Sequence, residues 1–157
     1  MKLTIIGMDV TSAKKILSWK YEKPYDFYNN EVTKEELKEI LNGSYKAITD
    51  NNGDMIGFLC IGEAAQVPVG HQYGVYNDKN VDLGLGMHPN YVGKGHGNEF
   101  CTFIMKHIRD EYLEVPIRLT VATFNKRAIH LYEKLGFVKK DEFTTDIAAF
   151  VTMIKEG

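Results

Sequence analysis

Hydrophobic residues recur at three- and four-residue spacing along residues 95–112, and this pattern predicts a helix with one buried stripe. The stripe comprises Phe100, Phe103, Ile104, Ile108 and Tyr112. Three further helices are predicted over residues 11–19, 32–41 and 125–136. Capping residues support their ends: Thr11 or Ser12 opens the first, Thr33 with Glu36 forms a capping box in the second, and Gly136 closes the third.

Short apolar and alternating runs predict the strands. They cover residues 2–8, 44–49, 55–63, 79–88, 117–123, 137–144 and 149–154, and the second and third are joined by the turn "DNNGD". The resulting order is β-α-α-β-β-β-α-β-α-β-β, without an internal repeat or a low-complexity linker. We therefore expect a mixed α/β fold in a single domain over residues 1–157.

Composition and charge exclude several classes of function. The net charge of −2 gives no reason to expect a nucleic-acid surface, although residues 92–140 carry nine Lys and Arg against five Asp and Glu. The five histidines show no metal-binding spacing, so no metal is expected. Cys60 and Cys101 have no CxxC spacing, and no apolar run is long enough for a membrane span, so we expect a reduced cytoplasmic protein.

The stretch "GKGHG", residues 93–97, places three glycines directly before the predicted helix at 95–112. A helix N-terminus exposes unpaired backbone N–H groups and partial positive charge, and glycines allow a phosphate to approach them closely. The same glycines would also suit a tight turn with no ligand. Neither a Walker A loop nor a Rossmann fingerprint fits, because the flanking residues and the preceding strand differ.

The joint pattern of "VDLGLGMHPNYVGKGHGNEF" and "LTVATFNKRAIHLYEKLGFV" resembles the two signature regions of the GNAT superfamily of acetyl-CoA-dependent N-acetyltransferases. The resemblance covers most of residues 81–138 and agrees with the element order upstream. It implies the GNAT acyl-CoA N-acyltransferase fold, with acetyl-CoA as co-substrate. It also assigns pyrophosphate binding to the loop residues Gly93, Lys94, Gly95, His96, Gly97 and Asn98. Val92 stands where the family usually has Gln or Arg, so one side-chain contact to the cofactor is missing.

Two glycines in "LGLGMH" are unusual inside a strand and indicate a bulge or a close backbone approach. In the family this strand separates from its neighbour and its free N–H groups bind the pantetheine arm and the thioester. The resemblance therefore implies that Leu85, Gly86 and Met87 contact the cofactor through their backbone, and that one of their N–H groups stabilises the oxyanion.

Acetyl transfer to an amine requires removal of a proton from the amine and a general acid for the departing thiolate. The resemblance assigns the acid to Tyr132, seven residues after Asn125, and implies that Asn125 contacts the cofactor. Core packing of Tyr132 and a helix N-cap role for Asn125 are the alternatives. Asp82, the only acid on its strand, is the candidate base, with a chain of water molecules or a solvated strand-edge charge as the other interpretations.

The acceptor is less well defined. Trp19, Tyr21, Tyr25 and Tyr28, together with His71 and Tyr73, could line an amine pocket or form a small core beneath a long loop. Thr120 replaces a glutamate that often occurs in relatives acetylating protein N-termini, which disfavours that substrate class.

The sequence thus predicts an enzyme, an N-acetyltransferase acting on a primary amine of a small molecule or peptide by direct attack in a ternary complex. A route through Cys101 is a minority hypothesis, because no histidine partner is evident. We expect no nucleic-acid or membrane partner, and a homodimer is compatible with the sequence. A non-catalytic acyl-CoA-binding regulatory module and an interaction domain for an acidic partner are the alternatives.

Overall fold

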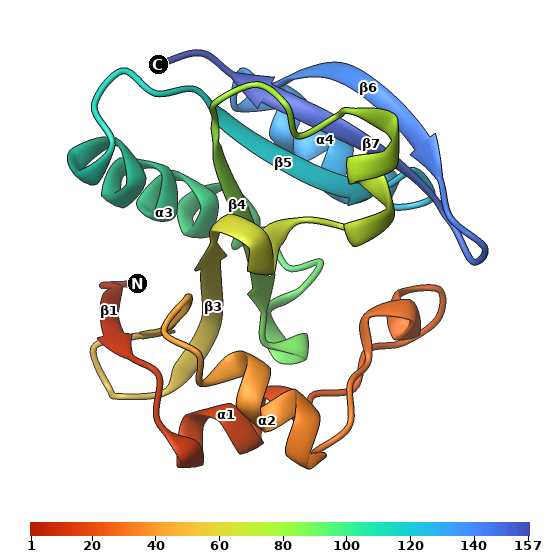
Figure 1. Ribbon diagram of the computed structural model, residues 1–157. Helices are drawn as coiled ribbons and strands as arrows, with labels where there is room; N and C mark the ends of the chain where they lie inside the picture. The colour runs from red at the N-terminus through yellow and green to blue at the C-terminus, as the bar shows by residue number, and fades with distance from the viewer. The chain divides into compact units, whose positions relative to one another are not determined.

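The computed structural model describes residues 1–157, and its elements follow the predicted order (Figure 1). The strands are β1 Thr4–Gly7, β2 Tyr45–Thr49, β3 Met55–Ile61, β4 Val81–Met87, β5 Ile117–Ala122, β6 Val138–Thr144 and β7 Ala149–Lys155. The α-helices are α1 Val10–Leu17, α2 Lys34–Ile40, α3 Gly97–Glu111 and α4 Lys126–Lys134. Four short 3-10 helices were not predicted: η1 Tyr25–Tyr28, η2 Gly62–Ala65, η3 Pro68–Tyr73 and η4 Pro89–Tyr91. The mixed α/β fold class is confirmed.

The chain divides into two compact units. The first contains Met1–Cys60 and Leu85–Gly97, and the second contains Ile61–Gly84 and Asn98–Gly157. Strand β4 contributes to both units, since its last three residues belong to the first. The glycine loop ends the first unit, and α3 continues from it into the second.

In the first unit, β1, β2 and β3 pair in antiparallel order, as the predicted hairpin requires. The end of β4 lies beside β3, where the His88 N–H donates to the Ile56 carbonyl at 2.7 Å. Helices α1 and α2 lie side by side (Figure 1). The Thr33 cap is confirmed, because its side chain accepts from the Glu36 N–H at 3.1 Å. The predicted cap of α1 is wrong: Asp9 takes that place, accepting from the Ser12 N–H at 2.7 Å.

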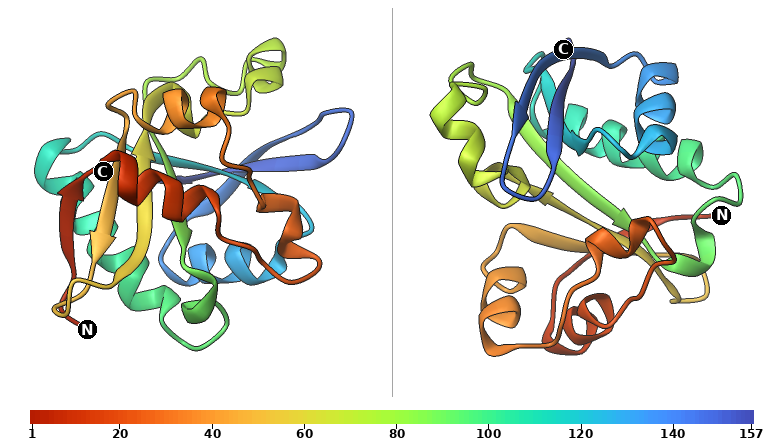
Figure 2. Two further views of the ribbon diagram at one scale, coloured as in Figure 1. Left: turned by 90° about the horizontal axis from the view of Figure 1, so that it is seen from below. Right: turned by 90° about the vertical axis from the view of Figure 1, so that its right-hand side faces the viewer.

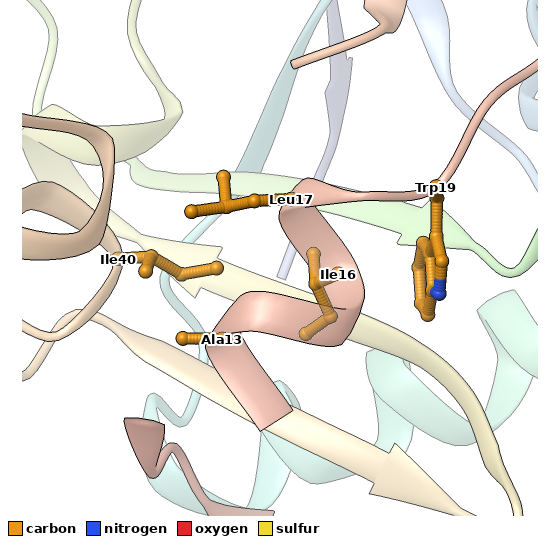
Figure 3. Packing of buried hydrophobic residues seen from close by; sticks show 5 residues of the cluster. All are labelled: Ala13, Ile16, Leu17, Trp19 and Ile40. Carbon is orange, nitrogen blue, oxygen red and sulfur yellow. The ribbon is translucent and has the colours of Figure 1, made fainter. Parts of the chain in front are cut away.

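The core of the first unit forms where α1 and α2 meet. Figure 3 shows the side chains of Ala13, Ile16 and Leu17 on α1, Ile40 on α2, and Trp19 just beyond α1. All five are at most 9% exposed. Burial of such apolar side chains contributes about 1.5–3 kcal/mol each, which fixes both helices within this unit.

In the second unit, β5 pairs in parallel with the start of β4 and antiparallel with β7, and β7 pairs with β6. Helix α4 lies along one face of these strands (Figures 1 and 2). The predicted stripe of α3 is only partly confirmed. Phe100, Ile104 and Ile108 are buried, but Phe103 is half-buried and Tyr112 is 37% exposed at the helix end. Cys101 completes the buried face instead.

The long connection between β3 and β4 belongs to the second unit and carries η2 and η3. Its residues Val75 and Tyr76 pack with Ala122, Phe143 and Phe150 in a second small core. No helix combines the length and apolar character needed to cross a membrane. Gly136, at φ +98°, follows α4 in the left-handed conformation predicted for it.

Candidate functional site

The glycine loop has the open backbone that the sequence predicts. Gly93 and Gly95 adopt φ values of +74° and +84°, which L side chains rarely adopt. A Cβ atom added to Gly95 would meet no other atom within 4 Å, so the space above this backbone is free for a phosphate. The loop leads directly into the first turn of the 15-residue helix α3, where an α-helix has N–H groups with no partner inside the helix.

Side chains of the loop differ in how they are held. Lys94 is exposed, whereas His96 is half-buried with its ring edge-on to Tyr91 at 5.5 Å. Asn98 accepts a hydrogen bond from the Thr102 hydroxyl at 3.3 Å on its own helix. Among these side chains, therefore, the exposed ammonium of Lys94 is the charged group that an anion at the loop could reach.

The end of β4 is held closely by its own unit. A Cβ atom on Gly86 would lie 2.4 Å from the Phe58 ring, so only glycine fits there. The Tyr21 hydroxyl donates to the Met87 carbonyl at 2.6 Å. The sequence "LGLGMH" indicated either a bulge or a close approach to the backbone. At Gly86 the close approach is observed, and it is made by the Phe58 side chain of β3.

Asp82, at the start of β4, is buried in an ion pair. Its exposed fraction is 5%, and Arg118 on β5 binds both carboxylate oxygens, Nε to Oδ1 at 2.6 Å and Nη2 to Oδ2 at 2.8 Å. Gln66 donates a third hydrogen bond to Oδ2 at 2.8 Å. The interpretation as a solvated strand-edge charge is therefore wrong, while a role as base stays a prediction.

Arg118 itself is fully engaged. Its Nη1 donates to the carbonyls of Val75 at 3.2 Å and Asp78 at 3.3 Å, and its guanidinium lies 5.0 Å from the centroid of the Tyr76 ring. Sequence reasoning missed this residue. The signal was present, because a lone Arg inside the apolar strand "IRLTVA" needs a buried counter-charge, and Asp82 is the neighbour that parallel pairing supplies.

The hydrogen bonds continue from Asp82 to the surface. Gln66 turns its amide NH₂ to Asp82, so its carbonyl oxygen faces His71 Nε2 at 2.8 Å and must accept from that nitrogen. Tyr76, whose ring packs on the Arg118 guanidinium, has its hydroxyl 2.9 Å from the Thr120 hydroxyl. Thr120 is thus occupied by a neutral hydrogen bond at the position where some relatives carry a carboxylate.

Tyr132 and Asn125 both lie in the second unit, on or before α4. The Asn125 side chain accepts from the Ala128 N–H at 3.1 Å, which makes it the N-cap of the helix. Tyr132 is 9% exposed, and its ring lies 5.9 Å from that of Phe137. The N-cap role of Asn125 is confirmed.

Cys101 is unsuited to nucleophilic catalysis. It is 3% exposed within the buried face of α3, and burial raises the pKa of its thiol to about 12. At neutral pH the reactive thiolate is therefore almost absent. Within residues 1–157 no group of three His, Cys, Asp or Glu side chains could hold a metal ion.

The aromatic residues proposed for an acceptor pocket separate into two kinds. Trp19 and Tyr21 belong to the core of the first unit. On the loop that follows, Tyr25 is half-buried and Tyr28 is 36% exposed. In the second unit Tyr73 is 55% exposed and donates to the Thr144 carbonyl at 3.3 Å, beside the exposed His71.

A comparison with family models matches residues 11–137 to the acetyltransferase (GNAT) family. The chain belongs to the GNAT family. GNAT enzymes transfer an acetyl group from acetyl-CoA to an amine, and this chain is accordingly an acetyltransferase that uses acetyl-CoA as co-substrate. The match includes the glycine loop, β4, β5 and α4. A search of curated proteins finds no match.

Solved structures agree with the GNAT fold. A chimera of the spermidine N-acetyltransferase SpeG from Vibrio cholerae with hSSAT has a TM-score of 0.71 at 19% identity, covering 99% of this chain and 96% of the other. A GNAT-family acetyltransferase from Bacillus anthracis has a TM-score of 0.72 at 14% identity, covering 99% and 95%. SpeG from Vibrio cholerae with manganese ions has a TM-score of 0.68 at 19% identity, covering 99% and 92%.

Proposed function

We propose that this GNAT enzyme acetylates a primary amine of a small molecule or peptide by direct attack on bound acetyl-CoA. The observation that carries the proposal is the short pairing of β4 with β5. Parallel pairing covers Val81 and Asp82, whereas Leu83 and Gly84 have no partner in β5, although β5 continues to pair with β7 up to Ala122. This opening supports a β4 backbone whose N–H groups are free for a ligand.

The proposed cofactor contacts come from the GNAT family pattern, and the first of them lie directly after Leu83 and Gly84. The backbone of Leu85, Gly86 and Met87 would bind the pantetheine arm and the thioester carbonyl. The loop residues Gly93, Lys94, Gly95, His96, Gly97 and Asn98 would hold the pyrophosphate, and Asn125 would contribute its amide. Gly95 fits a phosphate because nothing occupies the space where a Cβ would lie. Hydrogen bonds to charged oxygens contribute roughly 1.5–3 kcal/mol each.

For the chemistry we assign the general acid to Tyr132. The neutral amine attacks the thioester carbon, a C–N bond forms, and the C–S bond breaks with its electron pair on sulfur. The phenol of Tyr132 then donates its proton to the leaving thiolate. Tyr132 then regains a proton from the water that takes up the amine proton, so the transfer balances.

The amine proton has two routes, Asp82 or a chain of water molecules. Protonating Asp82 would leave the buried Arg118 guanidinium without its counter-charge, which is strongly unfavourable. We therefore propose that water carries the proton away and that Asp82 acts by holding Arg118 and Gln66 in place. Asp82→Asn should then lower activity mainly through stability, with little change in the pH profile.

A panel of amines tests the function directly. We would follow thiol release from acetyl-CoA with polyamines, amino acids, aminoglycosides and short peptides, with Tyr132→Phe alongside. Spermidine belongs on the panel because several proteins of the same fold are named spermidine N-acetyltransferases. Release that depends on one amine class and falls about 100-fold in Tyr132→Phe supports both enzyme and acid. No release by protein saturated with acetyl-CoA would support the non-catalytic binding module instead.

We also propose that the two units form one GNAT domain, because the family model spans residues of both. The homodimer and the cytoplasmic location stay predictions from the sequence.

A further inference from the structure

The peptide group between Met87 and His88 is fixed at both ends. Its carbonyl accepts from the Tyr21 hydroxyl at 2.6 Å, and its N–H donates to the Ile56 carbonyl at 2.7 Å. Because a peptide group is planar, two hydrogen bonds in opposite directions set its orientation. This peptide follows directly after Leu85, Gly86 and Met87, whose backbone is proposed to bind acetyl-CoA.

Tyr21 is itself held for this contact. Its backbone N–H donates to the Asn29 side chain at 2.8 Å, across the turn of the loop that carries η1. Two residues earlier, the Trp19 ring packs edge-on against His88 at 5.0 Å. The segment containing Trp19 and Tyr21 therefore contacts both Met87, the last residue of β4, and His88, which follows it. The Tyr21 hydroxyl bonds to Met87, and the Trp19 ring packs on His88.

A second feature limits movement of the same strand. The Phe58 ring fills the space beside Gly86, with which it is in close contact. Phe58 also lies 6.2 Å from Trp19, measured between ring centroids. Rotation of the β4 backbone is thus opposed by packing at Gly86 and by hydrogen bonds at the next peptide.

We infer that Tyr21 is a positioning residue of the acetyl-CoA site, which aligns the backbone N–H groups at the end of β4 through its hydrogen bond to the Met87 carbonyl. The inference rests on the proposed cofactor role of Leu85, Gly86 and Met87. Since a carbonyl oxygen can only accept, the phenol must stay protonated. Burial raises the pKa of Tyr21 to about 12, so this contact persists throughout the range in which acetyl transfer is measured.

Tyr21→Phe removes the hydroxyl and keeps the ring. We would measure the Kd for acetyl-CoA by calorimetry, well below the unfolding temperature, and expect a rise of about three- to tenfold. Tyr45→Phe is the matched control, because Tyr45 is another half-buried tyrosine packed on the same core and its hydroxyl bonds to Cys60 on β3. Its Kd should change less than about twofold, although both variants lose some stability.

Asn29→Ala provides a second variant that leaves the phenol intact and loosens only the Tyr21 backbone. A rise in Kd of about twofold is expected, and this variant decides the matter if Tyr21→Phe does not fold. Trp19, the only tryptophan, gives an independent reading of the same site through its emission as acetyl-CoA is added.

The outcomes separate the inference from the function on which it rests. Wild-type Kd values in folded Tyr21→Phe and in Asn29→Ala would overturn the inference and leave the proposed function standing. Failure of the wild-type protein to bind acetyl-CoA would overturn the proposed cofactor site, and the inference with it. A Kd raised equally in Tyr21→Phe and Tyr45→Phe would show a general loss of packing and would also overturn it.

Discussion

Asp82 and Arg118 form a buried, bidentate ion pair, and they are directly opposite each other at the second of the two positions where β4 pairs with β5. The pair stands where the two strands stop pairing, and Gln66 completes the hydrogen bonds of the carboxylate. The ion pair therefore joins the first residues of β4 to the first residues of β5.

Arg118→Met should destabilise the protein by about 3–5 kcal/mol, because Asp82 would remain buried without its partner. The double variant Asp82→Leu with Arg118→Met should be less destabilised than Arg118→Met alone, since no charge is then left unpaired. Urea denaturation of the wild-type and the variants measures both effects. Equal losses in the single and double variants would contradict the expected coupling.

Gly86→Ala should cost about 1–3 kcal/mol, since its Cβ would overlap the Phe58 ring at 2.4 Å. Gly7→Ala is the matched control, because Gly7 is also a strand glycine and its Cβ would meet no atom within 4 Å. Thermal unfolding compares them. Adding Phe58→Leu should recover part of the loss, and if it recovers none, the contact with the ring is not the cause.

Gly95→Ala should weaken acetyl-CoA binding about tenfold or more, because φ of +84° is strained for alanine and a shift of this loop disturbs the phosphate contacts. Gly53→Ala offers a close control at φ +82° in the β2–β3 turn, also with free space around its Cβ. Both should lose about 1–2 kcal/mol of stability. Only the Gly95 variant should raise KM for acetyl-CoA, and an equal rise in both would exclude a local role.

Stability should fall at alkaline pH, in part through Cys101. Burial raises the pKa of its thiol from 9.0 to about 12, so the folded state keeps a proton that the unfolded chain releases above about pH 9. Below that pH the group has no effect, and between pH 9 and 12 it costs up to about 1.4 kcal/mol per pH unit. Tyr21 adds a similar loss between pH 10 and 12.

Cys101→Ala should therefore unfold with a shallower pH dependence than the wild-type protein in urea denaturation between pH 8 and 11. The same variant should keep its acetyltransferase activity, because the thiol is buried and remains protonated during catalysis. Loss of activity with the fold intact would instead support a covalent route through Cys101.

Local sequence signals predicted much of the fold. The element order and the Thr33 cap are confirmed, since they depend on residues close together in the chain. The cap of α1 was missed because Asp9 precedes the apolar run and competes with two hydroxyl residues that suit the same position equally well. The predicted burial of Tyr112 is wrong, because α3 ends at Glu111 and the Tyr112 side chain lies at the surface.

For the candidate site, the sequence located the glycine loop, the β4 glycines, Asn125 and Tyr132, since each lies within a continuous motif. It could not pair Asp82 with Arg118, 36 residues away, nor Tyr21 with Met87, 66 residues away. Hydrophobic periodicity and backbone propensity depend on residues a few positions apart, so helices, strands and local motifs can be predicted from the sequence. Whether a buried carboxylate pairs with a guanidinium, or a carbonyl accepts from a phenol, depends on which distant segments the fold brings together. Only the tertiary structure decides that.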